Sequence, residues 1–478
     1  MQRQPTAQRR GRAHKGAALL IVLWVLVLLS IILTNFAITV STNARVAANA
    51  ADAAELQAIA EGGVEHAIAV LSMDTRGVDS SADAWYFSES EFQNVTLGAG
   101  TYTLDAFDAN VESSGHRPGI EDEASKLNLR TATREKLQTL GGLTPEQIDA
   151  LLDWQDGDAE TNPLGAESST YRALPENPHP AKDRPLDTVV ELQLLNAFDP
   201  TVLWGEDLNS NGILDPAEDD GDANPPNDNR DGVLDRGILP YVTVWSNDMN
   251  KTADGKDRVN INEASEEELK ASIPSLTDEE AKAIVEHRDS SRFEKVGELL
   301  KVKKPKKEEE KTDESQQNGE QESSDTSGNT NQEAPQSTQN NAGDSGEQRE
   351  NMFSRERVKQ IIGFCKIDNE PAKAGRININ TAPVRVLKTV PGIDEQRAQA
   401  ILLARNEGRS FETIAGLLDV AGISEENFIE ASEEITVKSD QFFVRSTARI
   451  EGVKRLAVAN AVIDRSAQPI KILYWNAE

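Results

Sequence analysis

The longest apolar stretch of the chain lies near its start. No charged residue occurs between Lys15 and Arg45, and the run from Ala17 to Ile38 is interrupted by polar side chains only at Ser30, Thr34 and Asn35. As a helix, this run is long enough to cross a hydrocarbon core of about 30 Å. The positive-inside rule keeps the N-terminus cytoplasmic, because five basic residues precede the run: Arg3, Arg9, Arg10, Arg12 and Lys15. The pattern predicts a single-pass membrane helix.

Apolar residues continue at helical spacing beyond this run. Leu56, Ala60, Val64, Ala67 and Leu71 recur every three or four residues in a stretch rich in alanine. We therefore predict one long helix over residues 17–73, wholly apolar at first and amphipathic afterwards.

Strict alternation of apolar and polar residues appears near both ends of the rest of the chain. "VTLGAGTYTLDAFDAN" predicts a half-buried strand after the helix. "QFFVRSTARIEGVKRLAVANAVIDR" predicts two strands about a turn at Glu451-Gly452, and "IKILYWN" predicts another. Neither group could easily bury a face alone, so we predict one antiparallel sheet interrupted by an inserted domain.

The middle of the chain contains three copies of one pattern. They read "LNLRTATREKLQTLGGLTPEQIDALLDWQDGD", "VNINEASEEELKASIPSLTDEEAKAIVEHRD" and "ININTAPVRVLKTVPGIDEQRAQAILLARNEG". Each has a short extended segment bearing Asn, a helix, a tight turn and a second helix, which is typical of a helix-hairpin-helix module. Capping pairs support the predicted helix starts, namely Thr144 with Gln147, Ser265 with Glu268, and Thr277 with Glu280.

Composition changes the picture in two places. Residues 303–351 are rich in Glu, Gln, Ser and Asn and almost without apolar residues, so we predict a disordered insertion there. The whole chain carries a formal net charge of -31, which repels phosphate backbones and leaves nucleic-acid binding dependent on local basic patches. Cys365 is the only cysteine, so an intramolecular disulfide is excluded.

Two acidic loops in residues 207–238 predict calcium sites. "DLNSNGILDPAE" matches the EF-hand loop, with Gly212 at the turn and the ligand positions occupied by Asp207, Asn209, Asn211, Ile213 (through its carbonyl), Asp215 and Glu218. "NDNRDGVLDRGI" places Asn227, Asn229, Asp231, Val233 and Asp235 in the same pattern. Its twelfth position is Ile238, so the last carboxylate is absent or comes from Asp219, Asp220 or Asp222. Hard oxygen ligands favour Ca²⁺ in a structural role, and the alternative is an acidic turn.

Catalytic motifs are missing from the sequence. The five histidines are scattered, and no Gly-rich phosphate loop, G-x-S-x-G or H-E-x-x-H pattern occurs. The acidic pair Glu121 and Glu123 is expected to be surface charge. We predict that the protein is not an enzyme.

The start of the chain resembles the leader of type IV pilin-like proteins. A short basic leader ends at Gly16, and the apolar helix follows directly. The resemblance implies cleavage between Gly16 and Ala17 by a prepilin peptidase, followed by methylation of the new N-terminus. Most pilins have Glu at the fifth mature position, where this chain has Ile21. That departure is similar to the type II secretion minor pseudopilin K family.

Membership of that family would account for nearly the whole chain. It implies an α+β, pilin-like fold with a helix (17–74, membrane-spanning over 17–38) packed on an antiparallel sheet (75–116 and 436–478). A large, mainly helical domain (117–435) would be inserted in the sheet, with helix-hairpin-helix repeats at 127–158, 259–302 and 377–424. The resemblance also implies an inner-membrane subunit with its bulk in the periplasm, at the tip of a pseudopilus with minor pseudopilins I and J.

The helix-hairpin-helix modules leave a second hypothesis open. They also resemble those of competence proteins, which implies a membrane-anchored DNA receptor. Such modules hold phosphates with backbone N–H groups at Gly-bearing hairpins. Only Pro391-Gly392-Ile393 keeps much of that chemistry, and the second hairpin is followed by Asp278, Glu279 and Glu280. We therefore expect the modules to serve mainly as structural units, with nucleic-acid binding the less favoured function.

Overall fold

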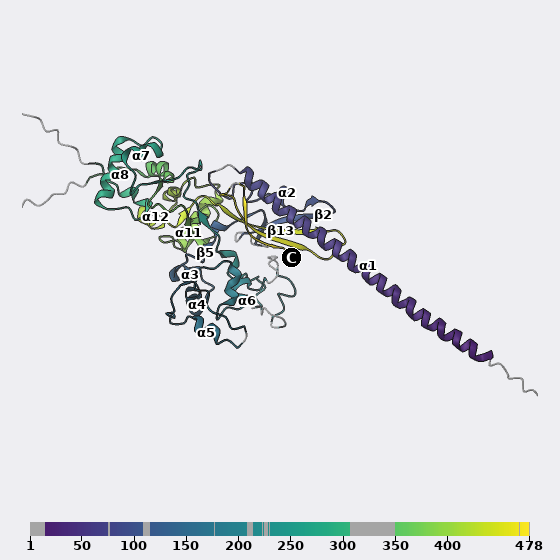
Figure 1. Cartoon of the computed structure of the whole chain (residues 1–478). Helices are drawn as coiled ribbons and strands as arrows, with labels where there is room; N and C mark the ends of the chain where they lie inside the picture. The colour runs from purple at the N-terminus through teal and green to yellow at the C-terminus, as the bar shows by residue number, and fades with distance from the viewer. Residues whose placement is uncertain are drawn as a thin grey trace, which may run out of the picture.

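The fold is described from a computed structural model of the whole chain (Figure 1). The described residues are 15–74, 77–108, 115–175, 177–207, 214–221, 223, 228, 230–305, 349–467 and 469–477. Most of the predicted leader and most of the predicted disordered insertion lie outside these residues.

One helix, α1 (Lys15–Met73), dominates the shape of the molecule. Its first half projects away from the rest of the protein, and its second half lies along the sheet (Figure 1). The side chains of residues 18–50 are all exposed, whereas Leu56, Val64 and Ala67 are completely buried. The predicted change from a wholly apolar to an amphipathic helix therefore coincides with the point where α1 begins to contact the sheet.

The sheet is antiparallel and joins segments from both ends of the chain. Its main strand order is β1-β2-β13-β14-β15, with β3 paired to β2 and β4 paired to β13. Opposite Tyr102 of β2 lies Ala448 of β13, and opposite Val444 lies Ala461 of β14. The strands are β1 (Val95–Leu97), β2 (Gly100–Phe107), β3 (His116–Pro118), β4 (Glu121–Asp122), β13 (Gln441–Ile450), β14 (Ala457–Asp464) and β15 (Lys471–Ala477). The predicted first strand is thus a β1–β2 hairpin, and the predicted split sheet and α+β fold are confirmed.

Glycine allows α1 to approach the sheet closely. A Cβ atom at Gly63 would lie 2.9 Å from the Tyr102 ring and would also overlap the Ser446 hydroxyl. The core beneath is formed by alternate strand residues such as Leu104, Phe442 and Val444, together with Trp85 and Phe92. Phe92 belongs to the short helix α2 (Glu89–Phe92).

Three helix-hairpin-helix modules form the inserted domain, as predicted. The first contains α3 (Arg134–Leu140) and α4 (Pro145–Gln155), followed by α5 (Ser168–Arg172), η2 (Val189–Leu194), α6 (Pro200–Trp204) and η3 (Leu239–Tyr241). The second contains α7 (Glu266–Ser272), α8 (Asp278–Ser290) and η4 (Val296–Lys301), and the linking elements α9 (Arg355–Ile361) and η5 (Ile362–Phe364) follow. The third contains α10 (Val384–Leu387), α11 (Glu395–Asn406), η6 (Ile414–Asp419) and α12 (Glu425–Ala431). The capping boxes at Thr144, Ser265 and Thr277 are present.

Each module is closed by a two-residue parallel strand pair. The pairs are β5 (Leu127–Asn128) with β6 (Val242–Thr243), β8 (Val259–Asn260) with β9 (Cys365–Lys366), and β11 (Ile377–Asn378) with β12 (Ile435–Thr436). A further antiparallel pair joins β7 (Asn247–Asp248) to β10 (Lys373–Ala374).

The repeated Asn residues explain the recurrence of the sequence pattern. Asn128, Asn260 and Asn378 each accept a hydrogen bond from the backbone N–H two residues later, at 3.0 Å. In the third module, Asn380 donates to the Phe411 carbonyl oxygen (3.0 Å) and accepts from the Phe411 N–H (2.8 Å). Asn128, Asn260 and Asn378 thus each fix the turn that leads into their module.

The third module lies between the second module and the pilin-like sheet, and the first module lies below it in this view (Figure 1). Its Asn378 donates to the Asp79 carbonyl oxygen (3.2 Å), to Asp122 Oδ2 (3.0 Å) and to Ser439 Oγ (3.0 Å). Arg465 of the C-terminal part pairs with Asp79 at 2.5 Å. These contacts join the end of α1, the first crossing into the inserted domain and the return to β13 at one buried point.

The expectation that Glu121 and Glu123 are surface charge is wrong. Both side chains are buried, 7% and 2% exposed, and each lies 2.8 Å from Lys126 Nζ. Glu123 also accepts a hydrogen bond from Thr243. Burial opposes the charge on Lys126, but the two carboxylates outweigh it, so the pKa of Lys126 is raised. Glu121, Glu123 and Lys126 therefore form a buried structural ion cluster at the start of the inserted domain.

The ends of the predicted disordered insertion are paired. Lys303 and Asn351 form an isolated antiparallel bridge, and the Lys304 N–H donates to the Glu350 carbonyl oxygen at 3.0 Å. The two ends of the insertion, at residues 303–304 and 350–351, therefore lie side by side. Residues 306–348 lie outside the described residues.

Candidate functional sites

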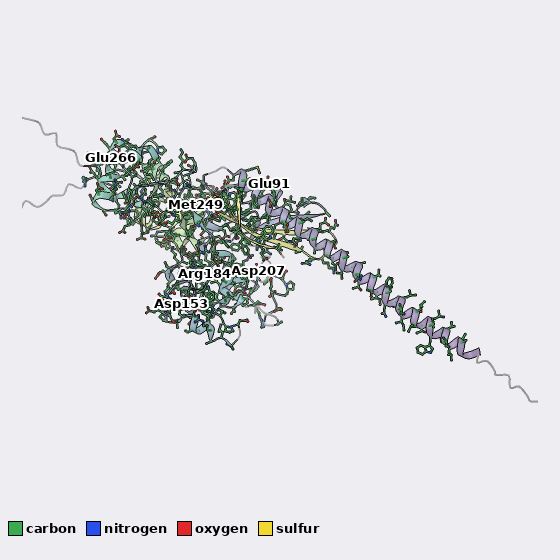
Figure 2. The ribbon with its side chains drawn as sticks, in the orientation of Figure 1. Glu91, Asp153, Arg184, Asp207, Met249 and Glu266 are labelled. Atoms are coloured by element: carbon green, nitrogen blue, oxygen red, sulfur yellow. The ribbon has the colours of Figure 1, made fainter. Side chains whose placement is uncertain are left out.

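The apolar half of α1 is the first candidate site. Within the part of the chain that the structure describes, α1 is the one helix long and apolar enough to cross a membrane. Ile21 is 63% exposed and Trp24 is 72% exposed, although both are large and apolar. Figure 2 shows side chains standing free along the projecting half of α1. Gly16 and Ala17, the predicted processing residues, lie in the first turn of α1, and Ile21 stands one turn further along.

The first predicted calcium loop is described only at its ends. Asp207 is 6% exposed, and Asp215 and Glu218 share a turn in which the Asp215 N–H donates to Glu218 Oε2 at 3.1 Å. Asn209, Asn211 and Ile213 lie outside the described residues.

The second predicted loop is described at Asp231, Val233 and Asp235, whereas Asn227 and Asn229 lie outside the described residues. The Asp235 N–H donates to Glu206 Oε2 (3.0 Å), and the Glu206 N–H donates to the Asp235 carbonyl oxygen (2.7 Å). The bases of the two predicted loops are thus joined beside Asp207. Ile238, at the twelfth position, is 1% exposed and belongs to the hydrophobic core.

A third group of carboxylates, missed by the sequence analysis, lies in the first module. Asp156, Asp158 and Glu167 each offer an oxygen, and these oxygens lie within 4.8 Å of one another. Asp156 is the C-cap of α4, and Glu167 is the N-cap of α5. Trp154 of α4 contacts Tyr171 of α5 edge to face at 5.1 Å, which holds the two helix ends together.

This group has the chemistry of a cation site. Glu167 is 5% exposed, and no described residue gives a hydrogen bond to its buried Oε1 or to the buried Oδ1 of Asp156. Burial raises the pKa of Asp156, and the charges of Asp158 and Asp153 raise it further. Burial likewise raises the pKa of Glu167. A hard divalent cation would satisfy these oxygens and offset their repulsion. The local "DGD" pattern was the available signal, but Glu167 follows nine residues later without a known spacing.

Each of the three hairpins, which would face phosphates in a nucleic-acid-binding module, contacts another part of the protein, while Gly142, Ser275 and Pro391 at their tips stay exposed. Arg385 donates to the Leu140 and Gly141 carbonyl oxygens of the first hairpin, at 3.0 and 2.9 Å. Arg357 donates to the Ser275 carbonyl oxygen of the second hairpin at 2.7 Å. A Cβ at Gly392 of the third hairpin would lie 2.6 Å from the Asn427 carbonyl oxygen.

The arginines near the second and third hairpins also form ion pairs within the protein. Arg357 forms a two-pronged ion pair with Glu280, with contacts of 2.7 and 2.8 Å, and Arg397 beside the third hairpin pairs with Asp394 at 2.6 Å. In the described part of the chain, these arginines are therefore engaged by protein oxygens, where a DNA-binding module would offer them to phosphate.

A long helix, apolar and then amphipathic, packed on an antiparallel sheet defines the chain as a pilin-like protein with a large insertion. Residues 121–204 match the family model of the type II secretion system (T2SS), protein K. This region begins at β4 and contains the whole of the first module and the Asp156–Glu167 cluster. Over this region the chain is similar to protein K, which confirms the family resemblance inferred from the leader. The matched family is a component of a secretion system and not a known class of enzyme.

Residues 254–308 and 372–436 match the family model of the helix-hairpin-helix motif, which confirms the second and third modules. A curated relative, ComE operon protein 1 of Bacillus subtilis (strain 168), is 34% identical over 83 residues. The aligned segment covers 17% of this chain and 40% of that relative, so the chain spans well under half of that relative's length.

A solved structure, the GspK-GspI-GspJ complex from the enterotoxigenic Escherichia coli type 2 secretion system, aligns with 90% of this chain and 99% of the matched chain. The sequence identity is 11% and the TM-score is 0.42. No role of an individual residue is transferred from that complex.

Proposed function

We propose that the protein is a minor pseudopilin that stands at the tip of a type II secretion pseudopilus and helps to initiate its assembly. The match of residues 121–204 to protein K carries this proposal, because that domain lies between strands of one pilin-like sheet. The inserted domain supports the tip position: it is far wider than α1 and flanks the end of the sheet where α1 terminates (Figure 1). A position between neighbours in a filament leaves no room for it.

The proposed membrane anchor is the apolar half of α1, with the N-terminus cytoplasmic and the bulk of the chain periplasmic. A prepilin peptidase would cleave between Gly16 and Ala17. Mass spectrometry of the mature N-terminus, from cells with and without that peptidase, tests this step. We expect a methylated chain starting at Ala17 only where the peptidase is present. A retained leader in both strains would overturn the pseudopilin proposal.

The proposed partners are minor pseudopilins I and J of the same system, as in the complex to which the structure is similar. Co-purification of the full-length protein with I and J from membranes tests this assembly. We expect a stable ternary complex, and we expect secretion to fail when this chain is deleted. Normal secretion in the deletion strain would exclude a required role at the tip.

We further propose that the inserted domain binds Ca²⁺ as a structural ion. Asp156, Asp158 and Glu167 would hold one ion, and the loops over residues 207–218 and 227–238 remain the predicted further sites. Calcium at about 100 times its Kd would stabilise the folded state by about 2.7 kcal/mol. Thermal unfolding with Ca²⁺ or with a chelator measures this effect.

Matched variants assign the ion to one place. Asp158→Asn is expected to remove most of the calcium-dependent stabilisation if the cluster is the main site. Asp231→Asn is expected to do so if the second loop is the main site. Each side chain lies near the surface, and Lys256→Gln on a distant exposed loop serves as a control. An unchanged melting temperature on chelation of the unsubstituted protein would contradict the calcium proposal.

The alternative function is that of a membrane-anchored DNA receptor of the competence type. The helix-hairpin-helix matches favour it. Fluorescence anisotropy with labelled duplex DNA at low and moderate salt distinguishes the two proposals. We expect no saturable binding, because the arginines near the hairpins are engaged by protein oxygens and the chain is strongly acidic. Tight, salt-dependent binding that is lost with Gly392→Asp would favour the receptor instead.

A further inference from the structure

A cavity of about 580 Å³ lies where the pilin-like sheet meets the second and third modules. Gly77–Ser80, which follows α1, forms one wall, and Ile435 and Val437, which lead to β13, form another. The second module contributes Val296 and Cys365. Exposed residues such as Glu412 and Ser410 also line the cavity, so it reaches the surface.

The lining is cationic, although the chain as a whole is strongly acidic. Lys251, Arg258, Arg376 and Lys438 line the cavity, and among the described residues Glu412 is its one acidic lining residue. Lys251 is paired with Asp257 at 2.5 Å, and Lys438 lies 3.8 Å from Asp440. The two arginines lie deeper and have different surroundings.

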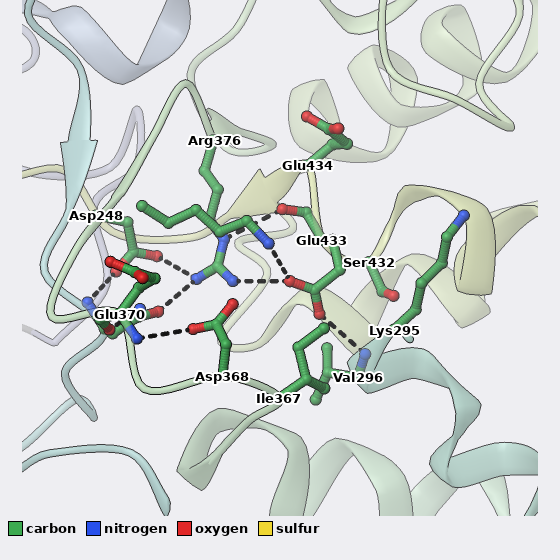
Figure 3. Close-up of polar contacts among 12 residues, drawn as sticks. Asp248, Lys295, Val296, Ile367, Asp368, Glu370, Arg376, Ser432, Glu433 and Glu434 are labelled. Atoms are coloured by element: carbon green, nitrogen blue, oxygen red, sulfur yellow. Dashed lines mark hydrogen bonds and ion pairs between the residues drawn. The ribbon is translucent and has the colours of Figure 1, made fainter. Parts of the chain in front are cut away.

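Arg376 is fully partnered. Figure 3 shows its guanidinium between Asp248 and Glu433, with distances of 3.0 and 3.2 Å. Asn250 Oδ1 also accepts from it at 3.0 Å. Lys373 adds a second cation on Glu433, at 2.5 Å.

Arg258 is only partly partnered. Its side chain is 16% exposed and forms an ion pair at 3.6 Å with Asp248, which it shares with Arg376. Its Nε is buried, and no described residue accepts a hydrogen bond from that atom. Burial would raise the pKa of Asp248, but the two guanidiniums outweigh burial and lower it. Three buried or half-buried cations (Arg258, Arg376 and Lys373) thus face two carboxylates.

The lining also has an apolar part, formed by Val78, Val296, Ile362, Phe364, Ile414 and Val437, and uncharged polar residues, namely Ser80, Thr252, Gln360, Ser410, Thr413 and Ser432. A guanidinium that keeps only one long, shared ion pair and lies beside apolar side chains selects an anion attached to an apolar body, because the anion satisfies the guanidinium and the body displaces water. We propose that this cavity binds a carboxylate with an apolar body, and that Arg258 is the residue that recognises the carboxylate. The ligand would contact the pilin-like sheet connections and two modules at once, so its binding would strengthen their junction.

The two sources of such a carboxylate are a free organic acid and the C-terminus of an apolar peptide. Fluorine NMR of para-trifluoromethylbenzoate with the full-length protein in detergent tests the first, and a fluorinated N-acetyl dipeptide of valine and leucine tests the second. The corresponding neutral amides are the controls. We expect saturable binding of at least one acid with a Kd below about 1 mM, and at least about tenfold weaker binding of its amide.

Four variants place the binding in the cavity. Arg258→Met is expected to raise the Kd at least about tenfold, whereas Arg258→Lys keeps the charge and stays within about fivefold. Lys373→Met removes a cation of the same network that does not line the cavity, and it is expected to leave the Kd unchanged. Ser410→Trp, at the exposed rim, blocks the cavity without disturbing the core and is expected to abolish binding even if Arg258→Met fails to fold.

Binding of the benzoate alone would identify a free acid as the ligand, and binding of the peptide alone would identify a chain terminus. The proposal is overturned if neither acid saturates, if the amides bind equally well, or if binding survives both Arg258→Met and Ser410→Trp. Partition of the probes into detergent is the same for every variant, so it cannot imitate the expected pattern.

Discussion

The second and third helix-hairpin-helix modules share a backbone but not a position in the molecule. In the second, Asn262 is half-buried and bonds Phe293, and the second hairpin places Ser275 at a φ of 59°. In the third, the equivalent Asn380 is 1% exposed, and Gly392 takes the corresponding turn with a φ of 78°. The second module lies at the periphery, and the third joins the whole molecule. The repeated sequence therefore specifies a repeated backbone. The burial of each copy decides how much a given side chain contributes to the stability of the fold.

Among the substitutions that test this comparison, Gly392→Ala is expected to lower the unfolding free energy most. An alanine would meet the Asn427 carbonyl oxygen at 2.6 Å and would also adopt an unfavourable positive φ. We expect a loss of about 3 kcal/mol in unfolding free energy, measured by urea unfolding. Gly408→Ala is the control, because its φ is +89° but no heavy atom lies within 4 Å. Equal losses in the two variants would show that the contact with Asn427 contributes nothing.

Asn380→Ala is expected to cost about 2–3 kcal/mol, because it leaves the buried N–H and carbonyl groups of Phe411 without their partner. Asn262→Ala removes the same pair of bonds to Phe293 and a bond to the Ile367 carbonyl oxygen (2.9 Å). Because the position is half-buried, water replaces these bonds, and the expected cost is about 1 kcal/mol. Chemical unfolding of both variants measures the difference. A larger loss for Asn262 would contradict the assignment of the third module as the central one.

The junction made by the third module is also expected to depend on pH. Burial raises the pKa of Asp79 to about 7, although Arg465 opposes the shift. The unfolded value is about 3.9, so between about pH 4 and pH 7 the folded state binds a proton that the unfolded state releases. The contribution of Asp79 to stability is therefore greatest at low pH and falls as the pH rises through this window.

Asp79→Asn removes that titration. Unfolding free energies from pH 5 to pH 8 are expected to fall less steeply in Asp79→Asn than in the unsubstituted protein. Asp278→Asn, an exposed position in the second module, is the control and is expected to leave the slope unchanged above pH 5. Parallel curves for Asp79→Asn and the unsubstituted protein would contradict the prediction.

Ser275→Gly is expected to produce the smallest effect, and with the opposite sign. The positive φ of Ser275 is unfavourable for a residue with a Cβ, so glycine is expected to stabilise the second hairpin by about 0.5–1 kcal/mol. A rise of the thermal midpoint measures it. A destabilised variant would mean that the Ser275 side chain makes a contribution larger than the backbone strain.

Local chemistry was predictable from the sequence, and distant partners were not. The helix starts at Thr144, Ser265 and Thr277 follow from residues three apart, and the alternation around Tyr102 and Leu104 follows from strand geometry. Glu121 and Glu123 were assigned to the surface because the sequence does not show that Lys126 and Thr243 enclose them. The Asp156–Glu167 cluster was missed for a related reason: the fold of α4 against α5 brings its members together, and no spacing rule describes it.

The completion of the sheet by β13 has a consequence for the order of events during synthesis. The inner face of α1 and the β1–β2 hairpin leave the ribosome early, but their partner strand begins at Gln441, after the entire inserted domain. At about 5–20 residues per second, the interval is on the order of tens of seconds. During that time the apolar residues Leu56, Val64 and Leu104 have no cover from β13 and β14. The nascent chain therefore has a long aggregation-prone interval, in which the membrane helix is already made and the inserted modules fold before the domain that carries them.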